Sequence, residues 1–277
     1  MKSLTHVIGS LLLLFSLREQ AFAMETLKTV EAKGEAYLSE ETTPSEAKAV
    51  ALNNARRQAL EQAVGVVVHG TTAVYNYQLI NDMVFTATKG LIIKEKILEH
   101  KCQPRDDQII CMARIEAIVK PLSLERKGSL SIVKAAVQRP DREDSAISPV
   151  FQKNDEIRVR VTVSEESYLT LFSVDQYGNI SKMYPNDYCN QTALTQDKEF
   201  TFPNESQRQS GLKLRVQVPK GKKKAIESVL VIAMKDKANL LSAKKIENPS
   251  LSDLMAELSE FDQSLWTNAT VGYEVRE

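Results

Sequence analysis

The sequence is poor in the residues that usually mark an enzyme or a nucleic-acid-binding protein. Its 277 residues include only 3 cysteines, 3 histidines and 1 tryptophan, and aromatic residues make up 6%. Lysine plus arginine and aspartate plus glutamate both number 36, so the formal net charge is zero. Because a general nucleic-acid binder normally carries a basic excess, we expect no nucleic-acid partner.

Catalytic and ligand-binding motifs are also missing. The sequence has no Gly-x-Ser-x-Gly elbow, no Walker A loop and no histidine at the spacing of a zinc site. Neither His69 nor His100 has such a spacing, and His69 is interpreted as a loop or packing residue. The loop 175–179 could offer oxygens to Ca²⁺, but it lacks the further acidic positions of an EF-hand, and a hairpin loop is the favoured interpretation. We expect no catalytic residue, no cofactor, no metal and no small-molecule substrate.

The longest apolar run lies at the amino terminus. Lys2 is followed by the apolar run Val7–Leu17, and an Ala-Phe-Ala stretch that ends at Ala23 is a small-x-small cleavage site. The run is about half of the roughly 20 residues that span a bilayer, so a cleaved signal peptide over residues 1–23 is favoured over an anchor. The sequence thus predicts a periplasmic or secreted protein.

Export would place the three cysteines in an oxidising compartment. Cys102 and Cys111 flank a turn that contains Pro and Asp, so the two thiols can face each other across paired strands. We predict a disulfide between them, because the spacing fits neither a CxxC redox pair nor a zinc site. Cys189 is then either a buried thiol or a site of intermolecular pairing.

Residues 24–121 are expected to form an α+β domain. After a first strand over 26–37, a helix begins with Thr43 as its N-cap, Pro44 at its first position and Glu46 three residues after the cap. The helix has a narrow face of alanines that suits it to lie close against a sheet. These alanines recur at every fourth residue: Ala47, Ala51, Ala55, Ala59 and Ala63.

The remainder of this domain is expected to add a helix and two strands. The helix is predicted over 75–88, and the strands over 91–100 and 108–119, joined by the turn that the cysteines flank. The order strand, helix, helix, strand, strand indicates helices on one face of a small antiparallel sheet. A linker over 122–128 ends the domain.

Residues 129–277 are expected to form an all-β sandwich. The segment Glu156–Val163 alternates between an apolar face and a polar face that carries Arg158, Arg160 and Thr162. Several short strands with turn residues between them are typical of a sandwich. Besides 156–163, strands are expected over 129–137, 200–202, 212–218, 229–233 and 270–275, with a short helix over 252–261.

The most informative part of this half is a β-hairpin over Tyr168–Asn186. An alternating run meets a turn at residues 175–179, and a second short run ends at Tyr184-Pro185-Asn186. In the favoured interpretation, side chains of the turn bond to the backbone and Gly178 takes a positive φ.

The first half resembles the amino-terminal domain of the flagellar assembly protein T group and related exported bacterial proteins. The resemblance covers Val30–Val119, about a third of the chain. It rests on Glu35-Ala36, Ala55-Arg56-Arg57-Gln58-Ala59, Ala63-Val64-Gly65, Thr71, Asp82, Gly90 and Lys96-Ile97-Leu98-Glu99. The resemblance implies an exported protein.

The second half resembles an uncharacterised bacterial all-β domain, which is found in exported proteins and beside caspase-like, kinase and von Willebrand-type modules. The hallmark consists of Tyr168, Leu169, Leu171, Phe172, Val174, Asp175, Gly178, Ile180, Tyr184, Pro185 and Asn186. This resemblance implies a β-sandwich and no catalytic residues.

Aromatic and basic side chains in the presumed loops form the candidate interaction surface. Aromatic residues with polar tips are frequent at recognition surfaces, and clustered lysines can contact anionic lipid headgroups or glycans. For the tyrosines, a place in the sandwich core is the alternative; for the lysines, a solvated turn between Val218 and Ile226 is the favoured interpretation. The candidates are Tyr177, Tyr188, Lys220, Lys222, Lys223 and Lys224.

We therefore expect a non-enzymatic exported envelope protein that acts as a scaffold or protein–protein interaction module in an envelope assembly. Its partners would be one or more envelope proteins. The alternative is an accessory domain that binds lipid headgroups or glycans, with peripheral contact to a membrane.

Overall fold

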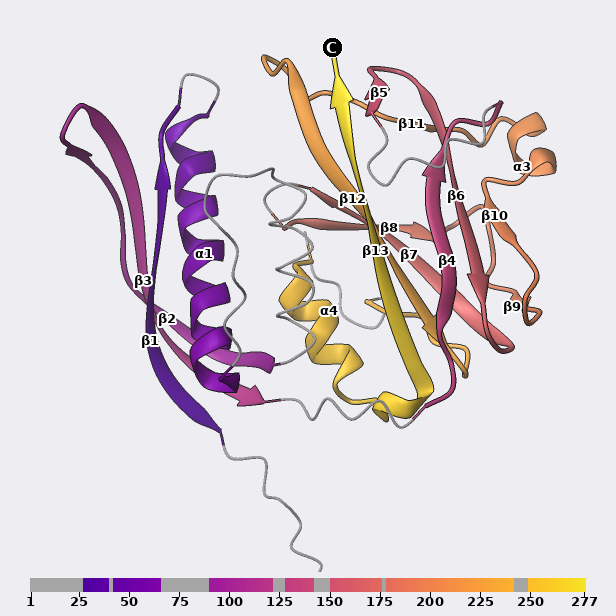
Figure 1. Ribbon diagram of the computed structural model, residues 1–277, viewed down its shortest axis with the longest axis horizontal. Coiled ribbons are helices and arrows are strands. Elements are labelled where there is room, and N and C mark those ends of the chain that lie inside the picture. Colours follow the sequence, from indigo (N-terminus) through magenta and orange to yellow (C-terminus); the bar gives the residue numbers. More distant parts are fainter. Residues whose placement is uncertain are drawn as a thin grey trace, which may run out of the picture.

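The chain folds largely into β-strands, as predicted. The computed structural model describes residues 27–39, 42–65, 90–121, 128–141, 150–175, 178–241 and 249–277. Its strands form three sheets, and the described helices lie beside them (Figure 1). The predicted signal peptide, the helix over 75–88 and Tyr177 lie outside the described residues.

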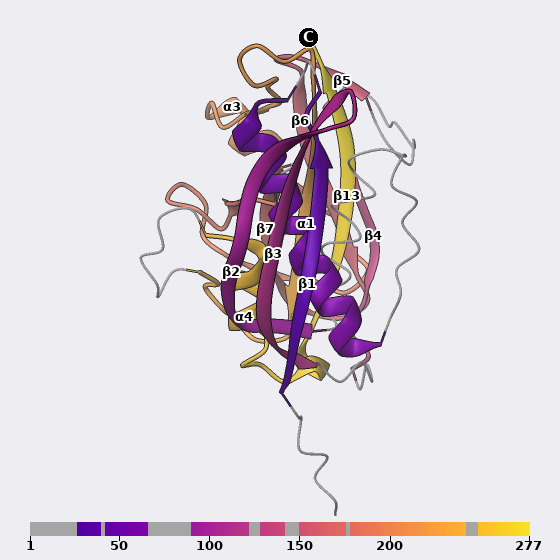
Figure 2. The ribbon, with the colours of Figure 1, turned by 90° about the vertical axis from the view of Figure 1, so that its left-hand side faces the viewer.

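The first sheet has three antiparallel strands and a long helix on one face. Strands β1 (Lys28–Tyr37), β2 (Gly90–Arg105) and β3 (Gln108–Pro121) pair in the order β1-β3-β2. Helix α1 (Pro44–Val64) lies along one face, and Figure 2 shows the sheet from its other side. The prediction of two strands joined by a tight turn is confirmed, although both strands are longer than expected.

Helix α1 begins and ends as the sequence predicts. The Thr43 hydroxyl accepts from the backbone N–H of Glu46, whose side chain accepts in return from the backbone N–H of Thr43. Gly65 closes the helix in the left-handed region, with a φ of 72°. All five alanines of the predicted narrow face are buried and pack against β1 and β3.

The alanine face brings α1 unusually close to β1 at Gly34. A Cβ on Gly34 would lie 2.0 Å from the carbonyl oxygen of Ala51 and 2.3 Å from the backbone nitrogen of Ala55. Next to this contact, two side chains of α1 bond to backbone groups of β1, which is an edge strand. Gln58 accepts from the backbone N–H of Lys33 at 2.7 Å, and Asn54 donates to the carbonyl of Glu35 at 2.9 Å. A side chain larger than hydrogen at position 34 would separate helix from sheet.

The predicted disulfide between Cys102 and Cys111 is present. The two residues lie directly opposite each other on β2 and β3, four residues from the turn at Asp106 and Asp107 on either side. Cys111 is fully buried under α1. Cys189 is a free, buried thiol.

The carboxyl-terminal half contains two further sheets. Strand β6 is the centre of the four-stranded sheet, with β4 on one side and β10 and β11 on the other. The six-stranded sheet has the order β5-β13-β12-β7-β8, and β9 also pairs with β7. The strands are β4 (Ile132–Gln138), β5 (Val150–Gln152), β6 (Glu156–Val163), β7 (Ser167–Asp175), β8 (Ile180–Tyr184), β9 (Ala193–Leu194), β10 (Phe200–Phe202), β11 (Leu214–Arg215), β12 (Lys224–Met234) and β13 (Trp266–Arg276).

The predicted alternation and hairpin are confirmed in these sheets. Strand β6 covers the predicted range 156–163, and β7 pairs with β8 in an antiparallel hairpin. The expected strand over 212–218 is reduced to β11, because β10 occupies most of the same side of β6. Strands β12 and β13 are longer than expected and pair with each other along their whole lengths.

Two hydrophobic clusters hold this half together. The first contains the inward side chains of β6, such as Val159 and Val161, together with those of the six-stranded sheet, such as Leu171 and Val231. The second lies on the other face of the six-stranded sheet, which helix α4 (Leu251–Leu258) covers. The six-stranded sheet is therefore buried on both faces.

The second cluster also reaches the first sheet. Leu91 of β2 is buried in it together with Leu254 and Met255 of α4, and α4 lies between α1 and the six-stranded sheet (Figure 1). A polar contact adds to this junction, since Lys222 Nζ lies 2.7 Å from Glu46 Oε2 at the start of α1. The two halves of the chain thus meet at the second cluster and at the Lys222–Glu46 ion pair.

Candidate functional site

The outer face of β6 carries a row of partly buried cationic side chains. Because β6 alternates, Ile157, Val159 and Val161 point into the core while Arg158 and Arg160 point outward. Only 13% of the Arg158 side chain and 18% of that of Arg160 are exposed. Guanidinium groups at this depth are held by neighbours and are not freely mobile in solvent.

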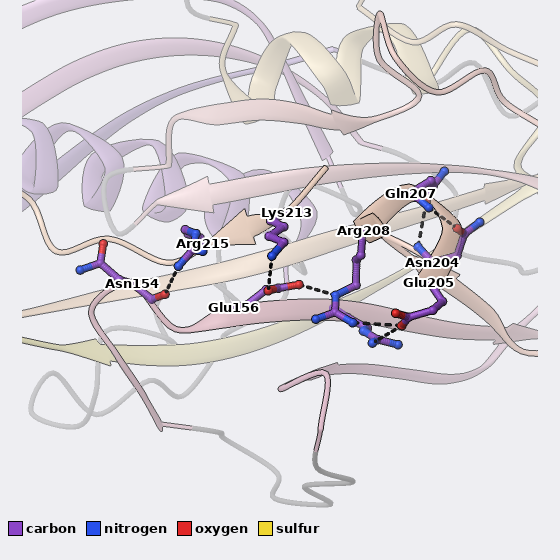
Figure 3. A network of polar contacts seen from close by, with 9 residues as sticks. Asn154, Glu156, Asn204, Glu205, Gln207, Arg208, Lys213 and Arg215 are labelled. Carbon is purple, nitrogen blue, oxygen red and sulfur yellow. Dashed lines mark hydrogen bonds and ion pairs between the residues drawn. The ribbon is translucent and has the colours of Figure 1, made fainter. Parts of the chain in front are cut away.

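The helix α3 (Glu205–Gln209) supplies the main neighbours of this row (Figure 3). Arg208 donates through Nε to Glu156 at the start of β6. Its Nη1 lies 3.0 Å from Glu205 Oε2, and the same oxygen lies 2.9 Å from Nη2 of Arg158. One carboxylate oxygen of Glu205 therefore joins two guanidinium groups.

Further cations lie beside Glu156. Lys213 Nζ is 4.0 Å from Glu156 Oε2. Arg215 lies opposite Glu156 in the register of β11 and β6, and its side chain donates to the carbonyl of Asn154 at 3.2 Å. The hydrogen bond from Arg208 is the main cause of a lowered pKa of Glu156, and the charges of Lys213 and Arg215 act in the same direction. The same hydrogen bond raises the pKa of Arg208. Glu156 thus stays ionised among these cations.

Positive charge exceeds negative charge in this network, which we call the arginine face. Arg158, Arg208, Lys213 and Arg215 surround the carboxylates of Glu156 and Glu205. In addition, Nε of Arg158 is buried and has no hydrogen-bond acceptor among the described residues. The named side chains of the arginine face thus carry more positive than negative charge.

The position of α3 is fixed at its amino end. Asn204 and Gln207 form a reciprocal capping box, with hydrogen bonds of 2.9 and 2.7 Å. The Nε2 atom of Gln207 also donates to Sγ of Cys189 at 3.2 Å, so the buried thiol has a polar neighbour within the chain. Tyr188, the neighbour of Cys189, is 87% exposed. These contacts place a large exposed aromatic ring on a loop that is bonded to α3.

The lysine cluster lies elsewhere, in the turn before β12 and at the first residue of that strand. Lys220, Lys223 and Lys224 are exposed, as expected for a solvated turn. Lys222 departs from that interpretation, because its side chain is only 13% exposed and is paired with Glu46. The cluster thus joins the two halves of the chain through one lysine and presents the other three to solvent.

The turn of the hairpin is stabilised by its own polar residues. Asp175 accepts from the backbone N–H of Asn179 at 2.9 Å and from its side-chain amide at 2.7 Å, and Gly178 has a φ of 83°. These contacts confirm the favoured interpretation of a hairpin loop. Among the described residues, no three His, Cys, Asp or Glu side chains gather as a metal site would require.

A partly buried carboxyl lies near the start of β12. Glu227 accepts a hydrogen bond of 2.6 Å from the hydroxyl of Tyr273, and Asp175 is its partner on the neighbouring strand β7. Burial raises the pKa of Glu227 most; the Tyr273 hydrogen bond opposes this shift, and the negative charge of Asp175 adds to it. Burial also raises the pKa of Tyr273.

Replacing this carboxyl by an amide is expected to make stability less dependent on pH. The pKa of Glu227 is higher in the folded than in the unfolded chain. Its contribution to the free energy of unfolding is therefore fully present below its pKa in the unfolded chain, and is lost as the pH rises through its pKa in the folded chain. Glu227→Gln keeps an acceptor for Tyr273, so the variant should gain stability over the parent as the pH rises. Urea unfolding at a series of pH values tests this. Glu116→Gln, on the exposed side of β3, is the control, and parallel pH curves for Glu227→Gln and the parent would contradict the prediction.

Sequence reasoning identified only part of the arginine face. The alternation of β6 predicts that Arg158 and Arg160 lie on a polar face, but it does not mark them as binding residues. Nothing in the sequence indicated that Glu205 and Arg208, some fifty residues further along, would contact that face. A charged pair at i and i+3 within a short polar stretch was the only available signal.

Comparison with known families places the arginine face in a recognised segment. Residues 150–235 match the family described as Domain of unknown function (DUF4384). The match runs from β5 to the end of β12 and includes the hairpin, α3 and every residue of the arginine face. It shows that the carboxyl-terminal half contains an uncharacterised domain, as predicted. No curated protein matches the chain. Among the described residues, no helix is long and apolar enough to cross a membrane.

Proposed function

We propose that this protein is a non-enzymatic, exported envelope protein that acts as a scaffold or protein–protein interaction module. The observation that carries the proposal is the arginine face, with its preorganised guanidinium groups, together with the exposed ring of Tyr188 on a loop that is bonded to α3. Arginine and tyrosine are enriched in interface hot spots, where ordered side chains lose little entropy on binding. A partner protein would bind through this surface.

The chain would serve as a two-part scaffold. In this proposal, residues 24–121 form an α+β module that resembles the amino-terminal domain of the flagellar assembly protein T group, and residues 129–277 form a β-sandwich after a linker over 122–128. Support comes from the separate hydrophobic clusters of each half, and from the junction at Leu91 and Lys222 that connects them. Such a junction would hold the two halves of the chain in a fixed relative orientation.

The proposed location is the periplasm or the exterior of a bacterial cell. The amino-terminal sequence has the pattern of a signal peptide that is cleaved after Ala23. The Cys102–Cys111 disulfide supports export, because such bonds persist in oxidising compartments. A second function, contact with lipid headgroups or glycans, is favoured by the exposure of Lys220, Lys223 and Lys224.

Site-specific crosslinking in the native cell envelope tests the proposed function. A photoreactive amino acid in place of Tyr188 should give a reproducible adduct with one envelope protein. The same group in place of Asp107, an exposed residue in the turn between β2 and β3, should not give that adduct, because the turn lies at the opposite end of the molecule from α3 (Figure 1). If an exported, folded protein gives no protein adduct at Tyr188, or the same adduct at both positions, the proposal is wrong.

A further inference from the structure

We infer that the arginine face binds an extended acidic segment of the partner protein, and that the side chain of Glu205 competes with this segment. The inference rests on the proposed function and names the chemistry of the partner. Its starting point is the surplus of cations: four basic groups surround two carboxylates. An anionic partner would complete the charge balance that the described residues leave incomplete.

The geometry at Glu205 favours a carboxylate as the ligand group. Guanidinium groups present several N–H donors in a planar fork that matches a carboxylate. Arg158 and Arg208 already converge on one carboxylate oxygen, at 2.9 and 3.0 Å. The Glu205 side chain that provides it is 59% exposed, whereas the two guanidinium groups are largely covered. A carboxylate from another chain can therefore replace that of Glu205 with little rearrangement of the arginines.

Glu156 differs from Glu205 and belongs to the fixed part of the face. Its side chain is only 16% exposed and is bonded to Arg208, with Lys213 close by. It orients Arg208 toward the position that Glu205 occupies. The carboxylate of Glu156 thus holds Arg208 in place, while a carboxylate of the partner can replace that of Glu205.

The arrangement of the arginines favours an extended polypeptide. Outward residues of a strand repeat at about 6.6 Å, and Arg158 and Arg160 are consecutive outward residues of β6. Acidic side chains at alternate positions of an extended segment have the same repeat. Arg160 lies 3.4 Å from Glu199, so this end of the row also has a carboxylate neighbour from its own chain. The exposed ring of Tyr188 offers an apolar contact of the kind found at protein interfaces.

A lipid surface fits this face less well than a polypeptide does. Anionic headgroups are usually attracted by clusters of mobile lysines, and on this protein such lysines lie in the turn before β12. The arginine face instead has guanidinium groups that neighbouring side chains hold in place, and several of them are paired with carboxylates. Directional recognition of carboxylates is the use that this geometry suits.

Binding of defined peptides to the mature protein tests the inference. The probe is a fluorescent peptide of alternating glutamate and serine, and the matched control peptide has glutamine in place of glutamate. We expect the acidic peptide to bind, with an affinity that falls as salt is added, and the glutamine peptide not to bind. Equal binding of both peptides, or of neither, would overturn the inference.

Variants of the chain test the site and the competition. Arg158→Gln should weaken binding of the acidic peptide about tenfold, and Glu205→Gln should strengthen it about fivefold by removing the competing carboxylate. Misfolding of a variant can explain a loss of affinity but not a gain. The expected gain for Glu205→Gln therefore cannot be attributed to a damaged fold. Arg105→Gln, which removes an exposed arginine from β2, is the control for charge alone and should have little effect. Unchanged binding in both test variants would contradict the inference.

The failure of this inference can be told apart from that of the proposed function. If the Tyr188 adduct forms in cells and is unchanged by Arg158→Gln and Glu205→Gln, the protein has a partner but not one that uses this chemistry. Vesicles of anionic phospholipid are a parallel probe. If these vesicles bind in an Arg158-dependent manner while the peptide does not, the arginine face is a lipid site and the inference is wrong.

Discussion

Gly34→Ala is expected to lower the free energy of unfolding by roughly 3 kcal/mol or more. The added Cβ would lie 2.0 Å from the carbonyl oxygen of Ala51 and 2.3 Å from the backbone nitrogen of Ala55. Both atoms belong to the backbone of α1, so no rotation of a side chain can relieve the clash. The helix must move away from β1, which would open the alanine face along its length. Urea unfolding, followed by circular dichroism, measures the loss.

A second glycine of the same sheet is the matched control. A Cβ on Gly90 would lie 3.0 to 3.3 Å from side-chain atoms of Val64, Leu60 and Val119, and these atoms can shift. Gly90→Ala should therefore cost clearly less than Gly34→Ala. If the two variants lose the same stability, or Gly34→Ala is as stable as the parent, then α1 and β1 are not in backbone contact at Gly34.

The sequence predicted α1 in detail because its signals are local. Thr43, Pro44 and Glu46 interact within one turn, and the alanine repeat follows directly from the helical period. The importance of Gly34 could not be found in this way. Its close contact depends on how far α1 approaches β1, and that distance is set by the packing of two elements that the local pattern treats separately.

The same distinction applies to the candidate site. The outward position of Arg158 follows from strand alternation, and the bonds of Asp175 in the hairpin turn follow from turn chemistry. The contacts of Glu205 with Arg158, and of Lys222 with Glu46, join residues 47 and 176 positions apart. Such pairs depend on the order of strands in the sheets and on the junction between the halves. Composition and periodicity carry no information about either.

Removal of the Cys102–Cys111 disulfide is the other change with a large expected effect. Its partners are 9 residues apart, and closing a loop of about this size is worth roughly 2.5 kcal/mol in the chain-entropy account. The β2–β3 ladder already limits this short loop, so we expect a loss of about 2 kcal/mol. Thermal unfolding with and without dithiothreitol measures it.

The location of the bond predicts where the protein would first loosen. Among the described strands, β2 pairs with β3 alone and so lies at the edge of its sheet, and Cys111 lies fully buried under α1. Reduction should therefore speed hydrogen exchange in β2 near Cys102, while β12, paired on both sides in the six-stranded sheet, stays protected. The double variant Cys102→Ala/Cys111→Ala should no longer respond to dithiothreitol. If the unfolding temperature of the oxidised protein does not change on reduction, the β2–β3 ladder alone holds the two strands together. The disulfide would then form because the compartment is oxidising, and would not add stability.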